Sequence, residues 1–149
     1  MRILCLLFAC SLVTGGCATS FAPLYRDYQA THFSSLSALQ DSLQLALNEA
    51  GWTLTTAPTP EALRTHPQTK ADLGLYRIKV FLDAVPLEAP YVRIFFHPYR
   101  YFIVGGRSKI AILRGDLLND LIHPLDKALQ HHGFVAVGTA HTRDKVPIR

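Results

Sequence analysis

The sequence predicts an α+β fold, a two-layer sandwich in which a mainly antiparallel sheet carries two amphipathic helices on one face. Two observations favour this class. Apolar residues recur at helical spacing in two segments, and the long stretch between these segments alternates as strands do. Hairpin signals join most of the strands, so neighbours should run antiparallel. A chain of 149 residues that is 49% hydrophobic is large enough for one domain with its own core.

The first predicted helix begins after Ser34 or Ser35, either of which can cap it, and ends at Gly51, which supplies a left-handed residue. Its apolar stripe consists of Leu36, Leu39, Leu43, Ala46, Leu47 and Ala50. Residues 52–56 alternate and are rich in β-prone side chains, so they predict a strand. Residues 58–69 break the pattern with prolines and leave room for at most one short helical turn.

The middle of the chain predicts a series of antiparallel strands. Alternating or β-prone runs cover residues 73–83, 91–97, 99–104 and 108–113. Pro98 is expected to interrupt the strand that precedes it, because a central strand cannot spare an amide donor. Gly105 and Gly106 stand between the last two runs, and a glycine pair in this place predicts a hairpin turn in which both residues adopt positive φ.

The second predicted helix runs from about Asp116, a good cap, to His132. Its apolar stripe consists of Leu118, Leu121, Leu125, Ala128 and Leu129. Pro124 lies inside this segment and must either kink the helix or begin its main part. Gly133 ends the helix, and residues 134–137 predict a last strand.

The start of the chain has the order of a secretory signal: a basic residue, an apolar run over residues 3–13, and small residues before a cysteine. The apolar run is too short for a transmembrane helix, which needs about 20 apolar residues. The segment from Leu12 to Cys17 reads Leu-Val-Thr-Gly-Gly-Cys and resembles the lipobox of bacterial lipoproteins. Thr14 stands where that family more often has leucine.

The resemblance implies diacylglyceryl transfer to Cys17, cleavage between Gly16 and Cys17, and N-acylation of the new terminus with a palmitate-type chain. Ala18, rather than aspartate, follows the cysteine, which in such lipoproteins implies the outer membrane and a domain at its periplasmic face. Ordinary secretory cleavage near Ala18 is the alternative and would leave a soluble periplasmic protein. The predicted organisation is a signal peptide over 1–16, a lipidated tether over 17–33, one α+β domain over 34–140 and a polar tail over 141–149. The tether is expected to dock on the domain or to form an edge strand through Tyr25, Tyr28 and Phe33.

Positive charge is concentrated in the predicted strand region. Between Arg77 and Arg114 the chain holds seven bases and two acids, an excess that raises nucleic acid as a partner. A periplasmic address argues against nucleic acid and leaves an anionic lipid or glycan, or an acidic envelope protein. The predicted binding residues pair apolar contact with anion capture and are Tyr99, Arg100, Tyr101, Arg107 and Lys109. The alternative is that Tyr101 and Val104 face a core while the bases are solvated groups that protect a sheet edge.

The sequence predicts a binding or scaffold domain accessory to envelope assembly or export, not an enzyme. It contains no nucleophile elbow, phosphate loop, HExxH motif or paired-carboxylate pattern. His131 and His132 are adjacent on a helix, where their side chains point about 100° apart, so no metal site is predicted, and no cofactor is expected. The alternatives are a hydrolase or metal-dependent enzyme that uses His97, Asp83 or His123, and a purely structural envelope component.

Overall fold

The computed structural model describes residues 24–33, 35–57, 59–111, 113 and 115–142. Within these residues the protein has an α+β fold with one open, eight-stranded sheet and two helices. Every strand pairing in this part is antiparallel, which confirms the predicted class and the predicted sheet type. No helix among the described residues is long and apolar enough to cross a bilayer. The predicted signal peptide, Cys17 and the end of the predicted tail lie outside the described residues.

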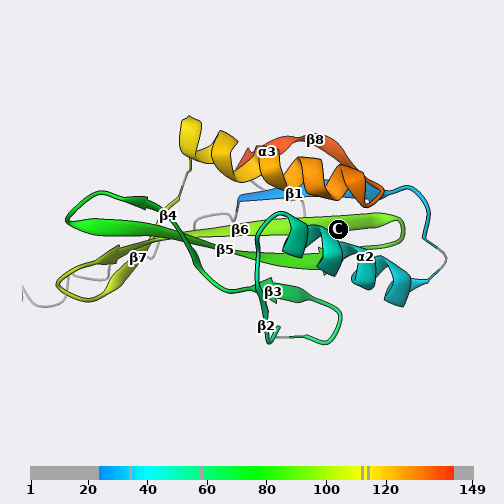
Figure 1. Cartoon of the computed structure of the whole chain (residues 1–149), viewed down its shortest axis with the longest axis horizontal. Helices are drawn as coiled ribbons and strands as arrows, with labels where there is room; N and C mark the ends of the chain where they lie inside the picture. The colour runs from blue at the N-terminus through cyan, green and yellow to red at the C-terminus, as the bar shows by residue number, and fades with distance from the viewer. Residues whose placement is uncertain (1–23, 34, 58, 112, 114, 143–149) are drawn as a thin grey trace, which may run out of the picture.

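The strands lie in the order β2-β3-β5-β6-β1-β8, while β4 and β7 pair with the far ends of β5 and β6 (Figure 1). Along the chain the elements are β1 (Leu24–Ala30), α2 (Leu36–Glu49), β2 (Leu54–Thr55), β3 (Leu63–Thr65), β4 (Gln68–Asp72), β5 (Tyr76–Pro86), β6 (Tyr91–Phe102), β7 (Arg107–Lys109), α3 (Asp116–His131) and β8 (Phe134–Thr142).

The two longest strands, β5 and β6, form the hairpin to which most of the other strands attach. Tyr76 lies opposite Phe102 at one end of this hairpin, and Pro86 lies opposite Val92 at the other. The half that ends at Pro86 is flanked by β3 and β1, and we call it, with the helices and the remaining strands, the body. The other half is flanked by β4 and β7 and projects as an arm (Figure 1). The arm comprises residues 68–80 and 98–109.

Alternate residues of β5 and β6 are buried, as the period-two pattern predicted. They share one hydrophobic core with apolar residues of both helices, and the residues between them point to the opposite face of the sheet. The fully buried members of this core include Val80, Leu82, Ile94, Phe96, Leu43, Leu47, Leu125 and Leu129. Each such side chain contributes about 1.5–3 kcal/mol by leaving water.

Both helices form where the sequence predicted them, but one cap differs. The Ser35 hydroxyl accepts a hydrogen bond from the Ala38 amide at 3.2 Å and caps α2, and Gly51 follows this helix with a φ of +82°. Asp116, the predicted cap of the second helix, is instead the first residue of α3. The capping position belongs to Gly115, whose φ of +64° favours glycine over aspartate, and no side chain caps this helix.

Two prolines lie inside regular elements. Pro124 lies within α3, so the helix begins before it. The prediction that Pro98 interrupts its strand is wrong, because β6 continues through this residue. On that edge of β6, β1 pairs as far as Phe96 and β7 pairs from Tyr99 onward. The Pro98 carbonyl accepts a hydrogen bond from the Ile110 amide at 2.9 Å. An amide at residue 98 would point to the same edge of β6, at the place where pairing with β1 has ended and pairing with β7 begins. The missing donor therefore removes no hydrogen bond from the middle of either pairing.

The predicted tether ends earlier than expected, because residues 24–30 form β1 inside the sheet. This strand lies between β6 and β8 and not at an edge. Tyr28 is buried, and its hydroxyl donates a hydrogen bond to Asp126 of α3 at 2.8 Å. Burial raises the pKa of Tyr28 well above its usual value, so the phenol stays a neutral donor. The described domain therefore covers residues 24–142 in place of the predicted 34–140.

Two short strands occur where the sequence predicted only a break. β3 and β4 are short and lie near prolines, so their alternation is not visible in the sequence. β3 is stabilised by the neighbouring strand β5, where the Leu82 amide donates a hydrogen bond to the hydroxyl of buried Thr65 at 2.8 Å. After the Gly105–Gly106 turn, β7 stops at Lys109 and is shorter than predicted. The last strand extends to Thr142, beyond the predicted residue 137, and lies at the edge of the sheet.

Candidate functional site

A row of aromatic side chains lies on the face of β5, β6 and β1 that points away from the core. Its centre is Phe81, whose ring stacks on His97 at a centroid distance of 4.5 Å and on Tyr99 at 5.9 Å. All members of the row are partly exposed. We call this set the aromatic row, and it consists of Tyr25, Phe81, Phe95, His97, Tyr99 and Tyr101. Aromatic side chains that keep a polar tip or an open face are enriched at recognition surfaces.

Cations cover the aromatic row along its length. A cation over a ring gains about 0.5–1 kcal/mol at an exposed site, so these pairs favour positions of the charged groups over the rings. The pairs, with the distance from the cation to the ring centroid, are Arg93–Tyr25 at 4.2 Å, Arg64–Phe81 at 5.4 Å, Lys79–Tyr101 at 5.1 Å and Arg107–Tyr99 at 5.3 Å. The face therefore combines apolar area with positive charge.

Four of the five predicted binding residues lie together on this face of the arm. In the β6–β7 ladder Tyr99 stands opposite Lys109 and Tyr101 stands opposite Arg107, and residues directly opposite each other share a face. The two tyrosines are half-buried, whereas both cations are exposed. The structure thus gathers these four side chains at the outer end of the aromatic row.

The fifth predicted residue, Arg100, points to the other face of the arm, where its guanidinium lies 5.6 Å from the ring centroid of Tyr76. The alternative in which Tyr101 and Val104 face a core is wrong. Tyr101 belongs to the face that points away from the core, and Val104 is 97% exposed. The arm therefore carries cations on both of its faces.

Acids neutralise the body cations that lie over the aromatic row, but not the cations of the β6–β7 ladder in the arm. Arg64 forms a bidentate pair with Asp83, with N–O distances of 2.6 and 2.7 Å. Arg93 forms a second bidentate pair with Asp27, at 2.7 and 2.9 Å. In the part of the chain that the structure describes, no carboxylate forms an ion pair with Lys79, Arg100, Arg107 or Lys109. The only arm cation with such a partner there is Arg77, which pairs with Asp72.

His97 and Asp83, which the enzyme alternative requires, do come together in the body. His97 Nε2 lies 3.1 Å from Asp83 Oδ2 but without the alignment of a hydrogen bond. Both oxygens of Asp83 already accept from Arg64, and burial lowers the pKa of His97, so its imidazole is neutral at pH 7. His123 is an exposed residue of α3, and among the described residues no hydrogen bond joins it to either partner. Asp83 is thus engaged by Arg64, and no hydrogen bond to Asp83 orients the His97 imidazole.

A second cluster of titratable groups joins the ends of the two helices. Glu49, the last residue of α2, contacts His132 Nε2 at 2.8 Å and His131 Nδ1 at 3.0 Å. Hydrogen bonds from both imidazoles lower the pKa of Glu49. The three ligand atoms lie within 4.8 Å of one another, so a divalent cation could replace the hydrogen bonds. The sequence analysis weighed His131 and His132 and predicted no metal site there, and it could not find Glu49, which lies 82 positions from His131.

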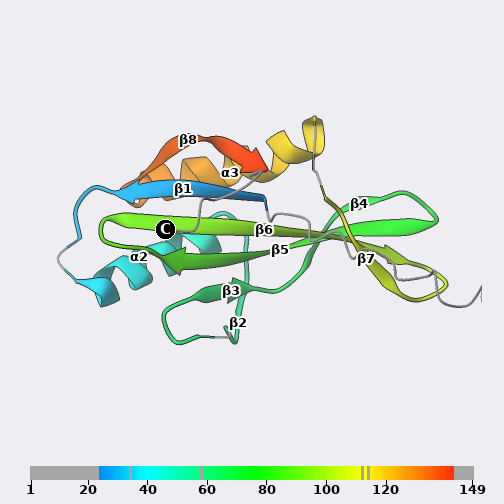
Figure 2. The ribbon, with the colours of Figure 1, turned by 180° about the vertical axis from the view of Figure 1, so that it is seen from behind.

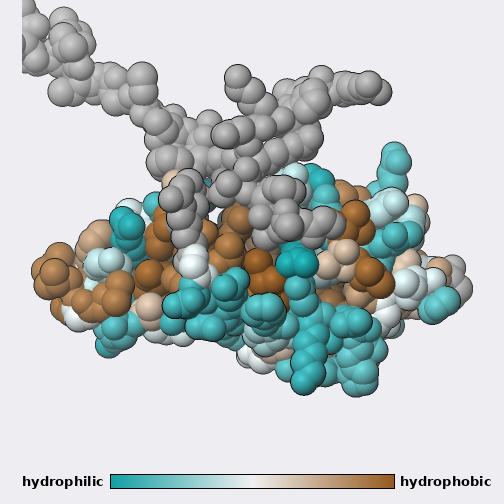
Figure 3. All heavy atoms as spheres, turned by 90° about the horizontal axis from the view of Figure 1, so that it is seen from above, coloured by the Kyte–Doolittle hydropathy of each residue, from teal (hydrophilic) through white to brown (hydrophobic). Residues whose placement is uncertain are grey.

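The arm ends in an exposed apolar tip, formed by the turn between β4 and β5 and the turn between β6 and β7. The Ile103 amide donates a hydrogen bond to the Leu75 carbonyl at 3.3 Å, which holds the two turns side by side. In Figure 3 hydrophobic colour gathers at the left end of the molecule, the end where the arm lies in Figure 1. We call this set the tip, and its members with their exposed fractions are Leu73 at 55%, Leu75 at 79%, Ile103 at 73% and Val104 at 97%.

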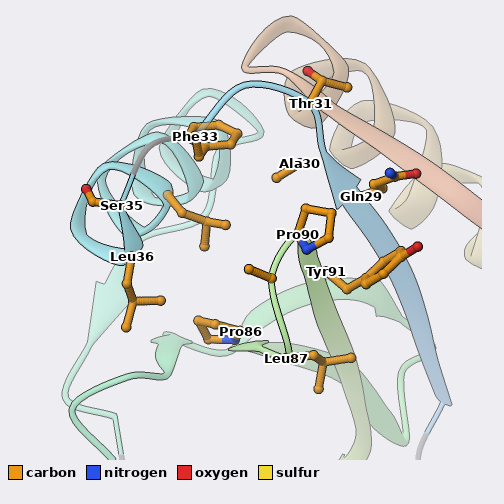
Figure 4. A pocket seen from close by; sticks show the side chains of 12 residues that line it. Gln29, Ala30, Thr31, Phe33, Ser35, Leu36, Pro86, Leu87, Pro90 and Tyr91 are labelled. Atoms are coloured by element: carbon orange, nitrogen blue, oxygen red, sulfur yellow. The ribbon is translucent and has the colours of Figure 1, made fainter.

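An apolar hollow lies at the opposite end of the β5–β6 hairpin, between β1, the start of α2 and the turn that joins β5 to β6 (Figure 4). Its volume is about 620 Å³. Its apolar lining includes Phe33, Leu36, Leu39, Pro86, Leu87 and Pro90. None of the described lining residues is charged. The hollow could accept an apolar group, but it offers no acid–base pair for catalysis.

Comparison with known proteins gives no significant match to a family model, a curated protein or a solved structure. Only the geometry of the described residues therefore bears on function. That geometry offers an aromatic and cationic face, an apolar tip and an apolar hollow, all of which are suited to binding. The sequence analysis did not predict the tip. A signal was present, because two glycine-containing turns carry apolar residues in place of the polar ones that turns usually have.

Proposed function

We propose that this protein is a lipid-anchored lipoprotein of the outer membrane whose periplasmic domain binds or scaffolds an envelope component. The binding surface that we propose is the arm end of the aromatic row, formed by Tyr99, Tyr101, Arg107 and Lys109. One observation carries the proposal: Lys79 and Arg107 of the arm lie over aromatic rings with no described acid to neutralise them, whereas Arg64 and Arg93, which lie over the same row in the body, are paired with acids. A surface of this kind fits an anionic partner, either an acidic envelope protein or an anionic lipid or glycan.

The anchor rests on the lipobox-like segment that ends at Cys17. Leu24, where β1 begins, stands seven positions after this cysteine. A fully extended chain spans about 3.3–3.6 Å per residue, so the domain would lie within about 25 Å of the anchor. Each acyl methylene in the bilayer contributes about 0.8 kcal/mol, and several chains together give stable attachment. The domain would thus work directly beneath the membrane.

The proposal also takes the domain as a two-layer sandwich with both helices on one face of the sheet. The shared core of the helices and of alternate residues of β5 and β6 supports this arrangement. The views from opposite sides agree with it: the helices lie in front of the strands in Figure 1 and behind them in Figure 2. In such an arrangement the aromatic row is left uncovered by helices and free to meet a partner.

The rival function is a hydrolase or metal-dependent enzyme that uses His97, Asp83 or His123. Both oxygens of Asp83 already accept hydrogen bonds from Arg64, and none of the described residues that line the hollow is charged. These two features favour binding over this chemistry. A purely structural envelope component is the third possibility. Stoichiometric metal held by His97, Asp83 or His123, or an activity that His97→Ala abolishes, would establish the enzyme in place of the binding domain.

The test is affinity purification of the full-length protein from its own membranes in gentle detergent, followed by mass spectrometry of co-purifying protein, lipid and glycan. We expect a stoichiometric partner with the wild type, and its loss in the Arg107→Glu, Lys109→Glu double variant. The control is Lys127→Glu, which makes the same type of charge change at an exposed position of α3. An equal yield of partner with the double variant would move the binding surface away from the arm, and an empty wild-type sample would favour the structural component.

The anchor is tested separately. Cys17→Ser should abolish acyl labelling and leave unprocessed precursor. Normal processing of this variant would mean ordinary secretory cleavage and a soluble periplasmic protein.

A further inference from the structure

We infer that the tip of the arm inserts into the surface of an anionic lipid bilayer, a step that rests on the proposed location of the domain beneath a membrane. The four apolar side chains of the tip are more than half exposed, with Val104 at 97%. Apolar side chains held together at the end of a projecting hairpin are costly in water and mark an interaction site. A bilayer accepts such side chains directly at its boundary between headgroups and acyl chains.

The backbone of the tip is shaped to bring these side chains forward. Gly74, Gly105 and Gly106 have φ values of +77°, +96° and +85°, which permit tight turns. In the first turn the Asp72 carboxylate accepts a hydrogen bond from the Gly74 amide at 3.2 Å. Two compact turns therefore end the arm, with apolar side chains at the very end and polar ones set back from it.

Charge around the tip complements anionic headgroups. Arg100 and Arg107 lie within four residues of the exposed Ile103 and Val104, and they point to opposite faces of the arm. No described acid pairs with either of them. Each base near an anionic membrane contributes about 1 kcal/mol to binding. Cations on both faces suit a bilayer that surrounds the tip, whereas a partner lying flat on one face would leave Arg100 unused.

The chain enters the domain from the side of the arm. Leu24 lies opposite Phe96 and Gln29 lies opposite Tyr91, so β1 begins at its arm-side end, as Figure 2 also shows. From Phe96 the strand β6 continues for six residues to Phe102, a length of about 20 Å. The seven positions between Cys17 and Leu24 can span about 25 Å. A lipid on Cys17 and the tip can therefore reach the same membrane.

The edges of the arm disfavour a second copy of the chain as the occupant. An exposed edge strand invites pairing unless it is short or bulged. β7 has only three residues, and the pairing of β4 with β5 shifts its register between Thr69 and Ala71. Sheet extension from one molecule to another is thus hindered on both edges, while the tip beyond them stays open.

The test places an environment-sensitive fluorophore on the tip of the lipidated protein. Val104→Cys is labelled after processing, when acylated Cys17 does not react, and the protein is reconstituted into phosphatidylcholine vesicles with or without phosphatidylglycerol. The matched control is Leu45→Cys, at an exposed leucine of α2. In anionic vesicles we expect a blue shift at residue 104 and quenching by nitroxide-labelled lipid, with neither effect at residue 45. Both effects should weaken as salt is added.

Equal accessibility of residues 104 and 45 to aqueous iodide in anionic vesicles would overturn the inference. Shielding of residue 104 in native membranes but not in pure lipid would assign the tip to a protein partner and would also overturn it. A second variant, Arg100→Gln with Arg107→Gln, changes no core residue and should remove the preference for anionic lipid. Persistence of that preference would contradict the role of the cations.

The experiment separates failure of the tip from failure of the anchor. Mass spectrometry of the same purified protein shows whether Cys17 carries acyl chains. If it carries none, the anchor is wrong, and flotation of this protein with anionic vesicles, with Val104→Asp as the comparison, still tests the tip. If it is acylated and the fluorophore stays in water, the anchor stands and the tip inference falls.

Discussion

The body and the arm are built on two halves of the same β5–β6 hairpin, yet they differ in how far their side chains are buried and paired. In the body, Leu82 is completely buried and Asp83 is engaged by Arg64. In the arm, Val104 is almost completely exposed and Arg107 has no described acid beside it. Because both halves belong to the same two strands, the difference comes from their neighbours. β1 and β3 supply Asp27 and Arg64 to ion pairs, whereas β7 supplies Arg107 and Lys109 without a described acid, and apolar turns follow β4 and β6.

This contrast indicates that the body stabilises the fold and that the arm is available for binding. Groups satisfied within the chain contribute to the stability of the fold, and groups left unsatisfied are available to a partner. Substitutions of buried or paired groups in the body should therefore change the free energy of unfolding, while substitutions of exposed, unpaired groups in the arm should mainly change binding.

The largest effect is expected from a cavity in the body. Leu82→Ala should lower the free energy of unfolding by about 3 kcal/mol, because the side chain is fully buried and leaves a cavity. The matched arm variant, Leu75→Ala, removes a 79% exposed side chain and should cost less than about 0.5 kcal/mol. Urea unfolding of the purified protein, followed by the fluorescence of buried Trp52, measures both. Similar losses in the two variants would contradict the division into body and arm.

A smaller effect is expected from the two arginine–aspartate pairs. Asp83→Asn leaves Arg64 without its carboxylate at a site where the aspartate side chain is 14% exposed, which should cost about 2 kcal/mol. Asp72→Asn breaks the Arg77 pair of the arm, where both side chains are more than half exposed, and should cost less than about 0.5 kcal/mol. The same unfolding measurement applies, and a larger loss for Asp72→Asn would reverse the comparison.

A modest pH effect should come from the body through His97. Burial lowers the pKa of His97 below its ordinary value of 6.5, so the unfolded chain binds the proton more tightly than the folded one. This contribution to stability is complete above pH 6.5 and is lost as the pH falls through the lowered folded pKa. His97→Gln should therefore flatten the dependence of unfolding free energy on pH below 6.5. A His66→Gln control removes an exposed imidazole, and an equal flattening there would assign the effect elsewhere.

The smallest change in stability is expected from the outer face of the arm. Arg107→Gln removes an exposed cation that touches the ring of Tyr99, so unfolding should change by less than about 0.5 kcal/mol. Recovery of the partner in detergent extracts should nevertheless fall. A stability loss as large as that of Asp83→Asn would mean that this cation belongs to the fold and not to a binding surface.

The elements that the sequence predicted correctly are those with a strong local period. Both helices, the long strands β5 and β6, and the turn at Gly105 and Gly106 follow from spacing and turn chemistry within short segments. The elements that it missed depend on distant partners. The sequence offers a docked tether or an edge strand around Tyr25 and Tyr28, whereas β1 lies between β6 and β8, and its central position depends on those two strands. β3, which was not predicted, gains its place through Thr65 and its neighbour β5.

The candidate site divides in the same way. The residues Tyr99, Tyr101, Arg107 and Lys109 could be chosen from composition alone, and alternation within β6 already separates Arg100 from the two tyrosines. Only the register of β6 with β7 places Arg107 and Lys109 on the same face as the tyrosines. The Glu49 cluster and the apposed turns of the tip join segments far apart in the chain, and their meeting is a property of the folded sheet.

By itself, the sequence determined the α+β class, the antiparallel hairpins, the two amphipathic helices and the basic aromatic segment, because each depends on residues a few positions apart. Tertiary structure alone decided which cations meet an acid, which apolar side chains meet the core and which are left at the tip. Those outcomes depend on which strands flank each half of the β5–β6 hairpin. Pairing between distant segments is chosen by the packing of the whole chain, and no short window of the sequence contains it.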